Sequence, residues 1–539
     1  MSKLRGHPAV FCTTTDARSR LTGIECPIVN SIRLSPHAIL PESIALPPVV
    51  PDSVGIVHLG WGAFHRAHQA IYTEDAMAET GDLSWGILGD VERTPILVSA
   101  LREQGGRYSV HAVDVDADGN PTTEARVVGS VVDVAYPGDE TGRLLATMAA
   151  PTTRVITLTI TEKGYCRNAA GDLDLDVVEP DLQAIREELF SRSTNSDEVT
   201  PAATAIGLLV RGLLARYQAG QQPITVLSCD NMAHNGKILR KVVDQFLRAI
   251  PASDPASLSQ PVADFVDWIN TNTTWPSSMV DRITPAATPE VLNQIEGHLG
   301  HRDEAGVAAE PFMQWVIEDN FANERPAWDL VGADLVDDVA PWEEAKLRML
   351  NGTHSLLAYA GRIHGYPTMA EAVNAPEIRP HAEMYMFADA TPSVTVPAGA
   401  DLNVYGQGLL HRFANPATGH TTQQVSTDGS QKIPFRWGGV LKHHLGEGRV
   451  PQGVAYGLAA WSEFVRRAVR DGVDLGDPSA AAVLTSTVNG AGVDNPAAVA
   501  RALLAVPGLI PENYGVDPAL TAAVVANVEE LAANTSGLV

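Results

Sequence analysis

The stretch GIVHLGWGAFHRAHQ at residues 55–69 decides how the first half of the chain folds. It predicts a buried strand, then a tight turn through Gly60 and Gly62, then a helix that starts near His65. Glycines at a strand-to-helix turn let the backbone approach a pyrophosphate, and the helix start supplies unpaired N–H groups. The third glycine of the usual dinucleotide fingerprint is absent, since Phe64 and His65 occupy that region, so a plain tight turn stays open as the alternative.

Further apolar runs repeat this pattern along the chain. RVITLTIT at 154–161 and PITVLSCD at 223–230 are rich in Val, Ile and Leu, and a helix-like segment at 205–217 lies between them. Short continuous apolar runs separated by helices are typical of parallel strands that are buried on both faces. The pattern predicts a Rossmann-like, doubly wound α/β domain over residues 51–335.

The remainder of the chain has a different character. Since domains hold about 50 to 250 residues, a chain of 539 residues is expected to form two substantial domains. Beyond residue 335 the strand signals largely stop, and Ala/Leu-rich stretches punctuated by Pro and Gly predict a mainly α-helical domain over 336–539. Residues 1–50 are irregular and rich in Pro, Ser and Thr, which indicates an N-terminal extension.

Charge and composition argue against several classes of partner. With 64 acidic against 38 basic residues the formal net charge is −26, and no Lys/Arg run interrupts it, which disfavours nucleic acid and anionic membranes. No segment has the apolar length of a signal-peptide core or of a membrane span. The four cysteines include no CxxC pair, which is typical of a reducing compartment. We therefore expect a cytoplasmic protein with a small-molecule ligand, and no obligatory protein partner is evident.

Asp90, which ends the segment WGILGD, bears on the choice of cofactor. A carboxylate past the end of the second strand accepts hydrogen bonds from an adenosine ribose and repels the extra phosphate of NADP. Asp90 follows the glycine turn at a suitable distance, and Glu92 is close behind it, so NAD is the expected cofactor. The alternative is that Asp90 merely caps the next helix.

The sequence lacks the catalytic groups of two common classes of dehydrogenase. Zinc-dependent alcohol oxidation needs clustered Cys and His ligands, and no cysteine lies in such a cluster, so we expect no metal. No tyrosine is followed by lysine at the fourth position, so the Tyr-x-x-x-Lys proton relay of short-chain dehydrogenases is missing. The remaining candidate for the proton acceptor is Lys346 in KLRMLNGTHS.

Lys346 is followed by Asn351 and His354. On an α-helix, at about 100° per residue, these residues lie roughly 140° and 80° around from Lys346, so all three share one broad face. A lysine buried there has its pKa lowered towards neutrality and can act as a general base, while an asparagine amide stabilises the developing alkoxide. The competing interpretation is a solvated lysine, a helix-terminating Asn-Gly and a histidine satisfied within the core.

Eight segments together resemble the mannitol dehydrogenase family of polyol-specific long-chain dehydrogenases. They occur in order and cover both predicted domains. The segments are HLGWGAFHRAHQAIYT, TITEKGYC, SCDNMAHNGK, SMVDRITPAATPE, EPFMQWVIEDNFANERPAW, KLRMLNGTHS, RFANP and DGSQK. The resemblance implies a Rossmann-type NAD domain followed by a mainly helical domain, with a metal-free active site in the cleft between them.

The resemblance also implies roles for residues in three groups, which are catalytic, substrate-binding and cofactor-binding. They are Lys346 as the general base with Asn231 and Asn351 as the oxyanion hole; Asp281, His354 and Arg412 at the substrate hydroxyls; and Gly60, Gly62 and Phe64 at the cofactor phosphates. Without the resemblance, Asp281 and Arg282 would be interpreted as a surface ion pair and Arg412 as a solvated helix position.

Sugar acids and polyols differ at the far end of the substrate, where only the sugar acid carries a carboxylate. A carboxylate there needs a cation, because burying an unpaired charge is costly. Lys163 in TITEKGYC offers one, and its surroundings are similar to those in fructuronate reductases, whereas Arg348 is a second cation that decides little. We expect interconversion of D-mannonate and D-fructuronate. The alternative is D-mannitol and D-fructose, with Lys163 as a solvated loop residue.

Two other classes of function agree less well with the sequence. A non-catalytic NAD-binding sensor would keep the glycine turn but has no reason to keep Lys346, Asn351 and His354 together with Asn231. A Rossmann enzyme of another reaction type, such as an NAD-dependent sugar epimerase or glycosidase, disagrees with the order of the eight segments. The missing Tyr-x-x-x-Lys relay further disfavours an epimerase.

Overall fold

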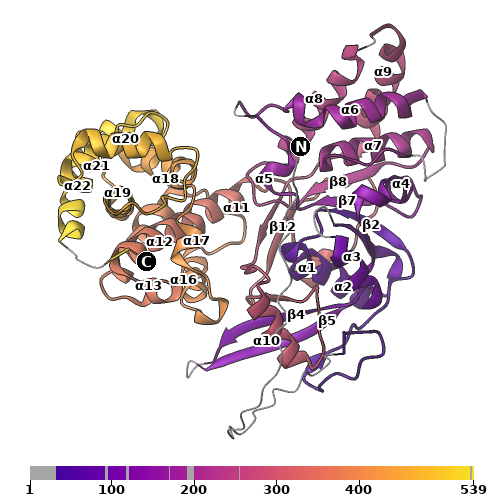
Figure 1. The fold of residues 1–539 in the computed structure, drawn as a ribbon, viewed down its shortest axis with the longest axis horizontal. Coiled ribbons are helices and arrows are strands. Elements are labelled where there is room, and N and C mark those ends of the chain that lie inside the picture. Colours follow the sequence, from indigo (N-terminus) through magenta and orange to yellow (C-terminus); the bar gives the residue numbers. More distant parts are fainter. Residues whose placement is uncertain are drawn as a thin grey trace, which may run out of the picture.

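The computed structural model of the chain describes residues 32–91, 95–116, 120–168, 170–190, 199–253, 255–533 and 537–538. Most of the predicted extension and Glu92 therefore lie outside the described residues. Figure 1 shows two lobes: one holds the sheets and their covering helices, and the other is built of helices. The predicted fold class, a Rossmann-type α/β domain followed by a mainly helical domain, is confirmed.

A six-stranded parallel sheet organises the first lobe. Its strand order is β6-β3-β2-β7-β8-β9, which in chain order is third, second, first, fourth, fifth and sixth. This is the order of the dinucleotide-binding doubly wound fold, and the direction of winding changes between β2 and β7. The strands are β2 (Val54–Leu59), β3 (Gly86–Asp90), β6 (Val131–Ala135), β7 (Val155–Leu158), β8 (Ile224–Ser228) and β9 (Thr273–Thr274).

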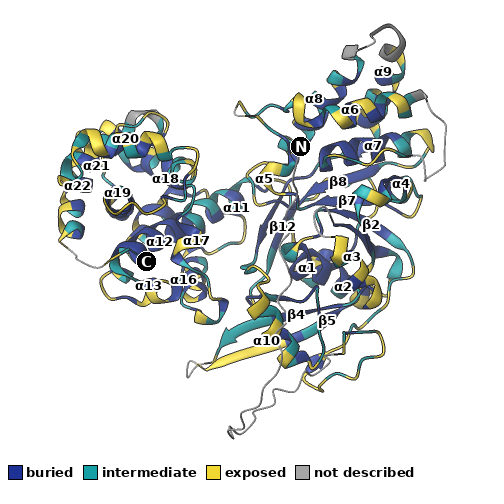
Figure 2. Cartoon of the chain, in the orientation of Figure 1, coloured by how far each residue is buried: buried dark blue, intermediate teal, exposed yellow. Residues whose placement is uncertain are grey.

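Helices cover both faces of this sheet, because its strands are apolar on both sides. Val57 and Leu59 of β2 pack in one cluster with helices α4, α6, α7, α8 and α9, while Ile56 packs on the other face with α2 and α3. Figure 2 shows the strands buried between these layers. The helices of this lobe are α1 (Ala63–Ala67), α2 (Gln69–Thr80), α3 (Pro95–Glu103), α4 (Pro137–Met148), α5 (Thr161–Gly164), α6 (Leu175–Phe190), α7 (Ala205–Gln218), α8 (Asn235–Ala249), α9 (Pro255–Asn272) and α10 (Pro289–Leu299), with 3₁₀ turns η1 (Leu83–Trp85), η3 (Ile250–Ser253) and η4 (Trp328–Val331).

Two smaller sheets, which the sequence patterns did not predict, complete the first lobe. A four-stranded sheet has the order β1-β5-β4-β11, and a three-stranded sheet has the order β10-β12-β13. In the latter, Asp281 lies opposite Gln314 in an antiparallel pair. The strands are β1 (Ile44–Ala45), β4 (Tyr108–Val115), β5 (Pro121–Val128), β10 (Ser278–Asp281), β11 (Val307–Ala309), β12 (Gln314–Glu318) and β13 (Asp334–Val336).

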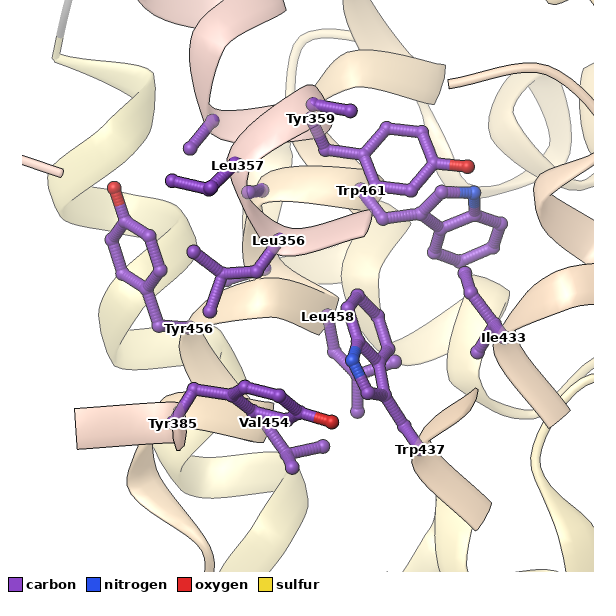
Figure 3. Packing of buried hydrophobic residues seen from close by; sticks show 14 of the residues in the cluster. Leu356, Leu357, Tyr359, Tyr385, Ile433, Trp437, Val454, Tyr456, Leu458 and Trp461 are labelled. Atoms are coloured by element: carbon purple, nitrogen blue, oxygen red, sulfur yellow. The ribbon is translucent and has the colours of Figure 1, made fainter. Parts of the chain in front are cut away.

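The second lobe has a core of its own. Figure 3 shows Leu356 of α12, Trp437 of α18 and Trp461 of α19 within one buried cluster. The helices are α11 (Ala340–Ala345), α12 (Gly352–His364), α13 (Met369–Asn374), α14 (Arg379–Glu383), α15 (Thr391–Ser393), α16 (Leu402–Phe413), α17 (Thr422–Val425), α18 (Gly429–Gly446), α19 (Gln452–Asp471), α20 (Ala481–Ala491), α21 (Pro496–Leu504) and α22 (Pro518–Ala532), the π-helices η5 (Lys346–Asn351) and η6 (Met384–Ala390), and the 3₁₀ turns η7 (Pro416–Thr418) and η8 (Pro511–Val516). Across the described ranges, no helix combines the length and apolarity needed to cross a bilayer.

The helix after the glycine turn differs from the expectation. α1 begins at Ala63 rather than near His65, and it ends after five residues. His68 interrupts the helical backbone with φ −131° and ψ −90°, and α2 starts at Gln69. The apolar periodicity of the segment could not reveal this interruption, because the side chains on both sides of it are buried.

Candidate active site

The glycine turn lies where the winding of the large sheet changes direction. Gly60 follows β2 and has φ +83°, and a Cβ atom there would overlap the carbonyl oxygen of Thr159 beyond β7. A Cβ atom on Gly62 would meet only the Gly60 carbonyl oxygen, at 3.7 Å, so the backbone of Gly62 is open to an approaching group. The first turn of α1 adds N–H groups without intrahelical acceptors. These features fit a dinucleotide pyrophosphate.

Three buried histidines underlie this turn. His58 and His65 stack with ring centroids 3.5 Å apart, and His58 lies within hydrogen-bond distance of Thr157 Oγ1 and Thr159 Oγ1, at 2.8 Å each. Phe64 stacks on His68 with ring centroids 4.9 Å apart. Burial lowers the pKa of His58 and that of His68 to about 3, and burial also holds the pKa of His65 far below its ordinary value. The rings are therefore neutral packing elements at ordinary pH.

Asp90 ends β3 beside the glycine turn, and its carbonyl oxygen accepts a hydrogen bond from the Trp61 N–H at 2.7 Å. Its side chain is completely buried, although a carboxylate that receives a ribose must become accessible to it. The position agrees with the predicted ribose contact, while the burial means that the surroundings would have to open. The contact with the cofactor remains a prediction.

Lys346 lies at the start of the π-helix η5, where the two lobes meet. Its Nζ donates to Asn231 Oδ1 and to the Val280 carbonyl oxygen, at 2.6 Å each. Both acceptors belong to the first lobe, so the lysine of the second lobe reaches across the junction. Burial lowers the pKa of Lys346, and repulsion from Arg412 and Arg436 adds to this effect against the attraction of Asp281.

A small pocket of about 60 Å³ adjoins the Lys346 ammonium. Asn351 lines it from the other end of η5. In a π-helix the backbone bonds run from i to i+5, which places Lys346 and Asn351 one turn apart on the same side. The lining residues are Asp230, Asn231, Met232, Ala233, Ser278, Met279, Val280, Glu343, Lys346, Leu347 and Asn351. The structure therefore brings together the lysine and the two asparagines of the predicted catalytic set.

The helical geometry assumed for this segment is wrong. An α-helix would turn Asn351 roughly 140° away from Lys346 around the helix axis, against roughly 80° for His354, whereas the π-helix brings Asn351 round to the side of Lys346. His354 is buried but does not line the pocket; it stacks on Phe413 at 5.0 Å between ring centroids. Burial, followed by repulsion from His420 and nearby arginines, holds its pKa well below the ordinary value.

Arg412 lies between two carboxylates. It donates to Asp281 at 2.7 and 3.1 Å and to Glu310 at 2.8 and 2.7 Å, and all three side chains are nearly inaccessible. Burial raises the pKa of Asp281, but Arg412 and Lys346 outweigh this and bring it below the ordinary value. The alternatives of a surface ion pair and a solvated helix position are wrong, because these groups are buried at the junction of the lobes.

Lys163 lies in α5 and is exposed, as are its two preceding neighbours. α5 follows β7 and faces the second lobe in Figure 1. α5, which carries Lys163, therefore lies on the side of the first lobe that faces the helical lobe. Lys163 is not part of the pocket around Lys346.

Several residues that shape the site were not predicted. Asp230 accepts from the N–H groups of Ile160 and Thr161 at 3.2 and 2.7 Å, which joins the loops after β7 and β8. Glu343 lies three residues before Lys346 and accepts from the His234 N–H at 2.8 Å. Burial raises the pKa of Glu343. The spacing from Lys346 could have indicated Glu343, since residues three apart share a helix face.

Two family models match the chain, one for each lobe. The model of the mannitol dehydrogenase Rossmann domain matches residues 54–330, and the model of the mannitol dehydrogenase C-terminal domain matches residues 338–531. The chain is also 40% identical to D-mannonate oxidoreductase of Escherichia coli (strain K12) over 482 residues, which are 87% of this chain and 92% of that protein.

Solved structures agree with this placement. A mannitol 2-dehydrogenase from Pseudomonas fluorescens, in a ternary complex with NAD and D-mannitol, is similar with a TM-score of 0.75 and 31% identity, over 93% of this chain and 97% of that one. A substrate-free D-sorbitol dehydrogenase is similar with a TM-score of 0.78 and 28% identity, over 93% and 98%. Because the matches span both lobes in order, the chain belongs to the mannitol dehydrogenase family, whose members are oxidoreductases that act on CH–OH groups.

Proposed function

We propose that this protein is a metal-independent, NAD-dependent oxidoreductase that interconverts D-mannonate and D-fructuronate, with Lys346 as the general acid and base. One observation carries the mechanism: a buried lysine with a lowered pKa borders a pocket that two asparagines share. A lysine in such surroundings can exchange a proton with a substrate oxygen near neutral pH. We also propose that the protein acts in the cytoplasm.

Each asparagine has a distinct part in the proposed reaction. The Oδ1 of Asn231 accepts from Lys346, which leaves the amide N–H groups of Asn231 to donate to the reacting oxygen. Asn351 approaches from the other end of η5. Two amide donors stabilise the negative charge that develops on the oxygen as Lys346 takes its proton, and in reduction the protonated lysine returns it. Removing such a donor costs about 10²- to 10³-fold in turnover.

The dinucleotide would lie on the carboxyl edge of the large sheet. Gly60, Gly62 and Phe64 would meet its phosphates and Asp90 its ribose, and bound NAD would accept or return the hydride. The strand order and the open backbone at Gly62 support this arrangement. Asp90 supports NAD over NADP, because a carboxylate repels the extra phosphate.

The substrate carbinol would then lie between the nicotinamide and Lys346. Asp281, His354 and Arg412 would bind the remaining hydroxyls, with Lys163 as the expected partner of the carboxylate. The similarity to a D-mannonate oxidoreductase over most of both chains favours the sugar acid. Oxidation of D-mannitol to D-fructose is the second candidate, supported by the similarity to a mannitol 2-dehydrogenase. A non-catalytic NAD sensor is disfavoured, because a sensor does not need a buried lysine in this pocket.

The first experiment follows NADH absorbance with D-fructuronate and, separately, with D-fructose, for the protein and for Lys346→Ala. We expect kcat with D-fructuronate to fall at least 10²-fold in the variant, because the proton donor is lost. Lys241→Ala, at an exposed lysine of α8 that pairs with Asp172, is the control. Near-normal turnover of Lys346→Ala would contradict the assignment. A preference of the unmodified protein for D-fructose would replace the sugar acid with the polyol.

A further inference from the structure

The segment η5, which carries Lys346 and Asn351 at its two ends, contacts a second π-helix. This second segment is η6 (Met384–Ala390), and both belong to the helical lobe. π-Helices are rare and frequently occur at functional sites. Two such segments in contact indicate that η6 has a part in the geometry of η5.

The backbone of η5 departs from an α-helix at one particular hydrogen bond. In an α-helix the Gly352 N–H would donate to the Arg348 carbonyl oxygen, four residues earlier. Here it donates instead to the carbonyl oxygens of Leu347 and Met349, five and three residues earlier. The Arg348 carbonyl oxygen accepts from the hydroxyl of Tyr385, in η6, at 2.6 Å. The Tyr385 hydroxyl therefore occupies the acceptor that would close an α turn.

Tyr385 is held in place by the core of the helical lobe. Its side chain is completely buried in the same cluster as Val454 of α19 (Figure 3). A Cβ atom on Gly453 would overlap the backbone of Tyr385, and Asp389 of η6 accepts from the Val454 N–H at 3.0 Å. Burial raises the pKa of Tyr385, so its hydroxyl keeps the proton that it donates. The donor is thus fixed independently of η5.

Gly352, directly after Asn351, is complementary to this hydroxyl. A Cβ atom on Gly352 would overlap the Tyr385 oxygen, so a residue with a side chain could not approach it in this way. The Gly352 carbonyl oxygen accepts from Trp437 Nε1 of α18 at 3.2 Å. Side-chain donors from two neighbouring elements therefore meet the backbone near the end of η5 where Asn351 lies.

We propose that Tyr385 is a positioning residue that keeps η5 in its π conformation and thereby holds Asn351 on the side of Lys346. The inference rests on the proposed roles of Lys346 and Asn351 in the reaction. Without the hydroxyl, the Arg348 carbonyl oxygen takes the Gly352 N–H as its donor, because a buried acceptor without a partner is costly. The turn then closes to an α-helix, and Asn351 rotates away from the oxygen that exchanges its proton with Lys346.

The test measures kcat and KM for D-fructuronate in Tyr385→Phe, which removes one oxygen atom. We expect kcat to fall about 10- to 10²-fold with little change in KM, since a displaced oxyanion donor weakens the transition state more than the binding of the ketose. Tyr359→Phe is the matched control. Its buried hydroxyl donates to the Ser426 carbonyl oxygen at 3.1 Å, away from η5, so this variant loses the same kind of bond and should keep its kcat.

A second comparison separates positioning from a general effect on the fold. In the Asn351→Ala background, which lacks the side chain that is positioned, Tyr385→Phe should lower kcat by less than about twofold, because residues that act through one another are not additive. The same loss of kcat with and without Asn351 would overturn the inference. Equal kcat in Tyr385→Phe and Tyr359→Phe would overturn it as well.

The crystal structure of Tyr385→Phe tests the turn without reference to activity. We expect the Gly352 N–H to donate to the Arg348 carbonyl oxygen in this variant, and retention of the π turn would contradict the inference. If the unmodified protein reduced neither D-fructuronate nor D-fructose while the turn still closed in the variant, the proposed reaction would fail and the hold of Tyr385 on η5 would stand.

Discussion

Gly60 is constrained in two independent ways. Its φ of +83° lies in the left-handed region, and a Cβ atom would overlap the Thr159 carbonyl oxygen. Gly81, after α2, has a similar φ of +73° but has nothing within 4 Å of its Cβ position. The comparison separates backbone strain from the close approach of two loops.

At this scale we predict that Gly60→Ala destabilises the protein more than Gly81→Ala. The backbone strain costs about 1–2 kcal/mol in each, and only the first variant also pushes the loop after β7 away. The free energy of unfolding in urea measures the difference, and the Kd for NAD should rise in Gly60→Ala alone. Equal behaviour of the two variants would show that the contact with Thr159 has no effect.

The candidate site was predictable residue by residue to the extent that it depends on local sequence. Lys346 and Asn351 come together within one segment, whereas Asn231, 115 residues from Lys346, was expected only from the family resemblance. The partner of Arg412 was not predictable, because Asp281 and Glu310 are 131 and 102 residues away in the chain. Glu343 and Val280 contribute through contacts that only the folded chain makes.

Among the elements, β2, α1 and the start of α2 contain three buried histidines that make the stability of the fold depend on pH. His58 of β2, His65 of α1 and His68 between the helices are buried in their neutral forms. Since the pKa of each is lower in the folded state than the ordinary value of about 6.5, unfolding takes up protons. This contribution to stability is complete above pH 6.5 and is lost as the pH falls towards 3.

We therefore predict that the free energy of unfolding decreases between pH 6.5 and 5, and that His68→Gln makes this decrease shallower. Each buried neutral histidine contributes a slope of up to about 1.4 kcal/mol per pH unit in this window. Urea unfolding at several pH values measures the slope, and His37→Gln, at an exposed position, is the control. An unchanged slope in His68→Gln would show that His68 charges without unfolding.

Elements with regular patterns were predicted best. The apolar runs at 154–161 and 223–230 contain β7 and β8. The segments after residue 335 that were expected to be helical form the helices from α11 to α22. The hairpin of β4 and β5 was missed, since much of β5 is exposed and polar. The π-helix η5 was treated as an α-helix, because apolar spacing does not reveal a change from i→i+4 to i→i+5 bonding.

For the whole molecule, the group formed by Arg412, Asp281 and Glu310 joins the lobes. Arg412 belongs to α16 of the helical lobe, and both carboxylates belong to the first lobe. Removing one partner of a buried ionic group leaves the others uncompensated, which costs about 3–5 kcal/mol. Here that cost acts on the contact between the lobes.

Arg412→Met should consequently loosen the two lobes while each keeps its own core. We expect faster cleavage by a protease in the connection at residues 337–339, between β13 and α11, and a lower Tm. Arg449→Met, which removes only an exposed pair with Glu447, should leave the cleavage pattern unchanged. Identical proteolysis of both variants would mean that the remaining contacts, including those of Lys346 and Glu343 with the first lobe, hold the lobes together without this group.

The π-helix at Lys346 has a consequence for chain length. A π turn accommodates more residues than an α turn, so deleting one residue between Lys346 and Asn351 would let the segment continue as a regular α-helix. The backbone would become more regular, and the ends of the segment, then four residues apart, would lie roughly 40° from each other around an α-helix and so stay on one side. The hydroxyl of Tyr385, which donates to the Arg348 carbonyl oxygen at 2.6 Å, helps to satisfy the widened turn. The π turn thus keeps Lys346 and Asn351 on one side although five positions separate them, whereas a regular α-helix with all six residues kept would place them about 140° apart.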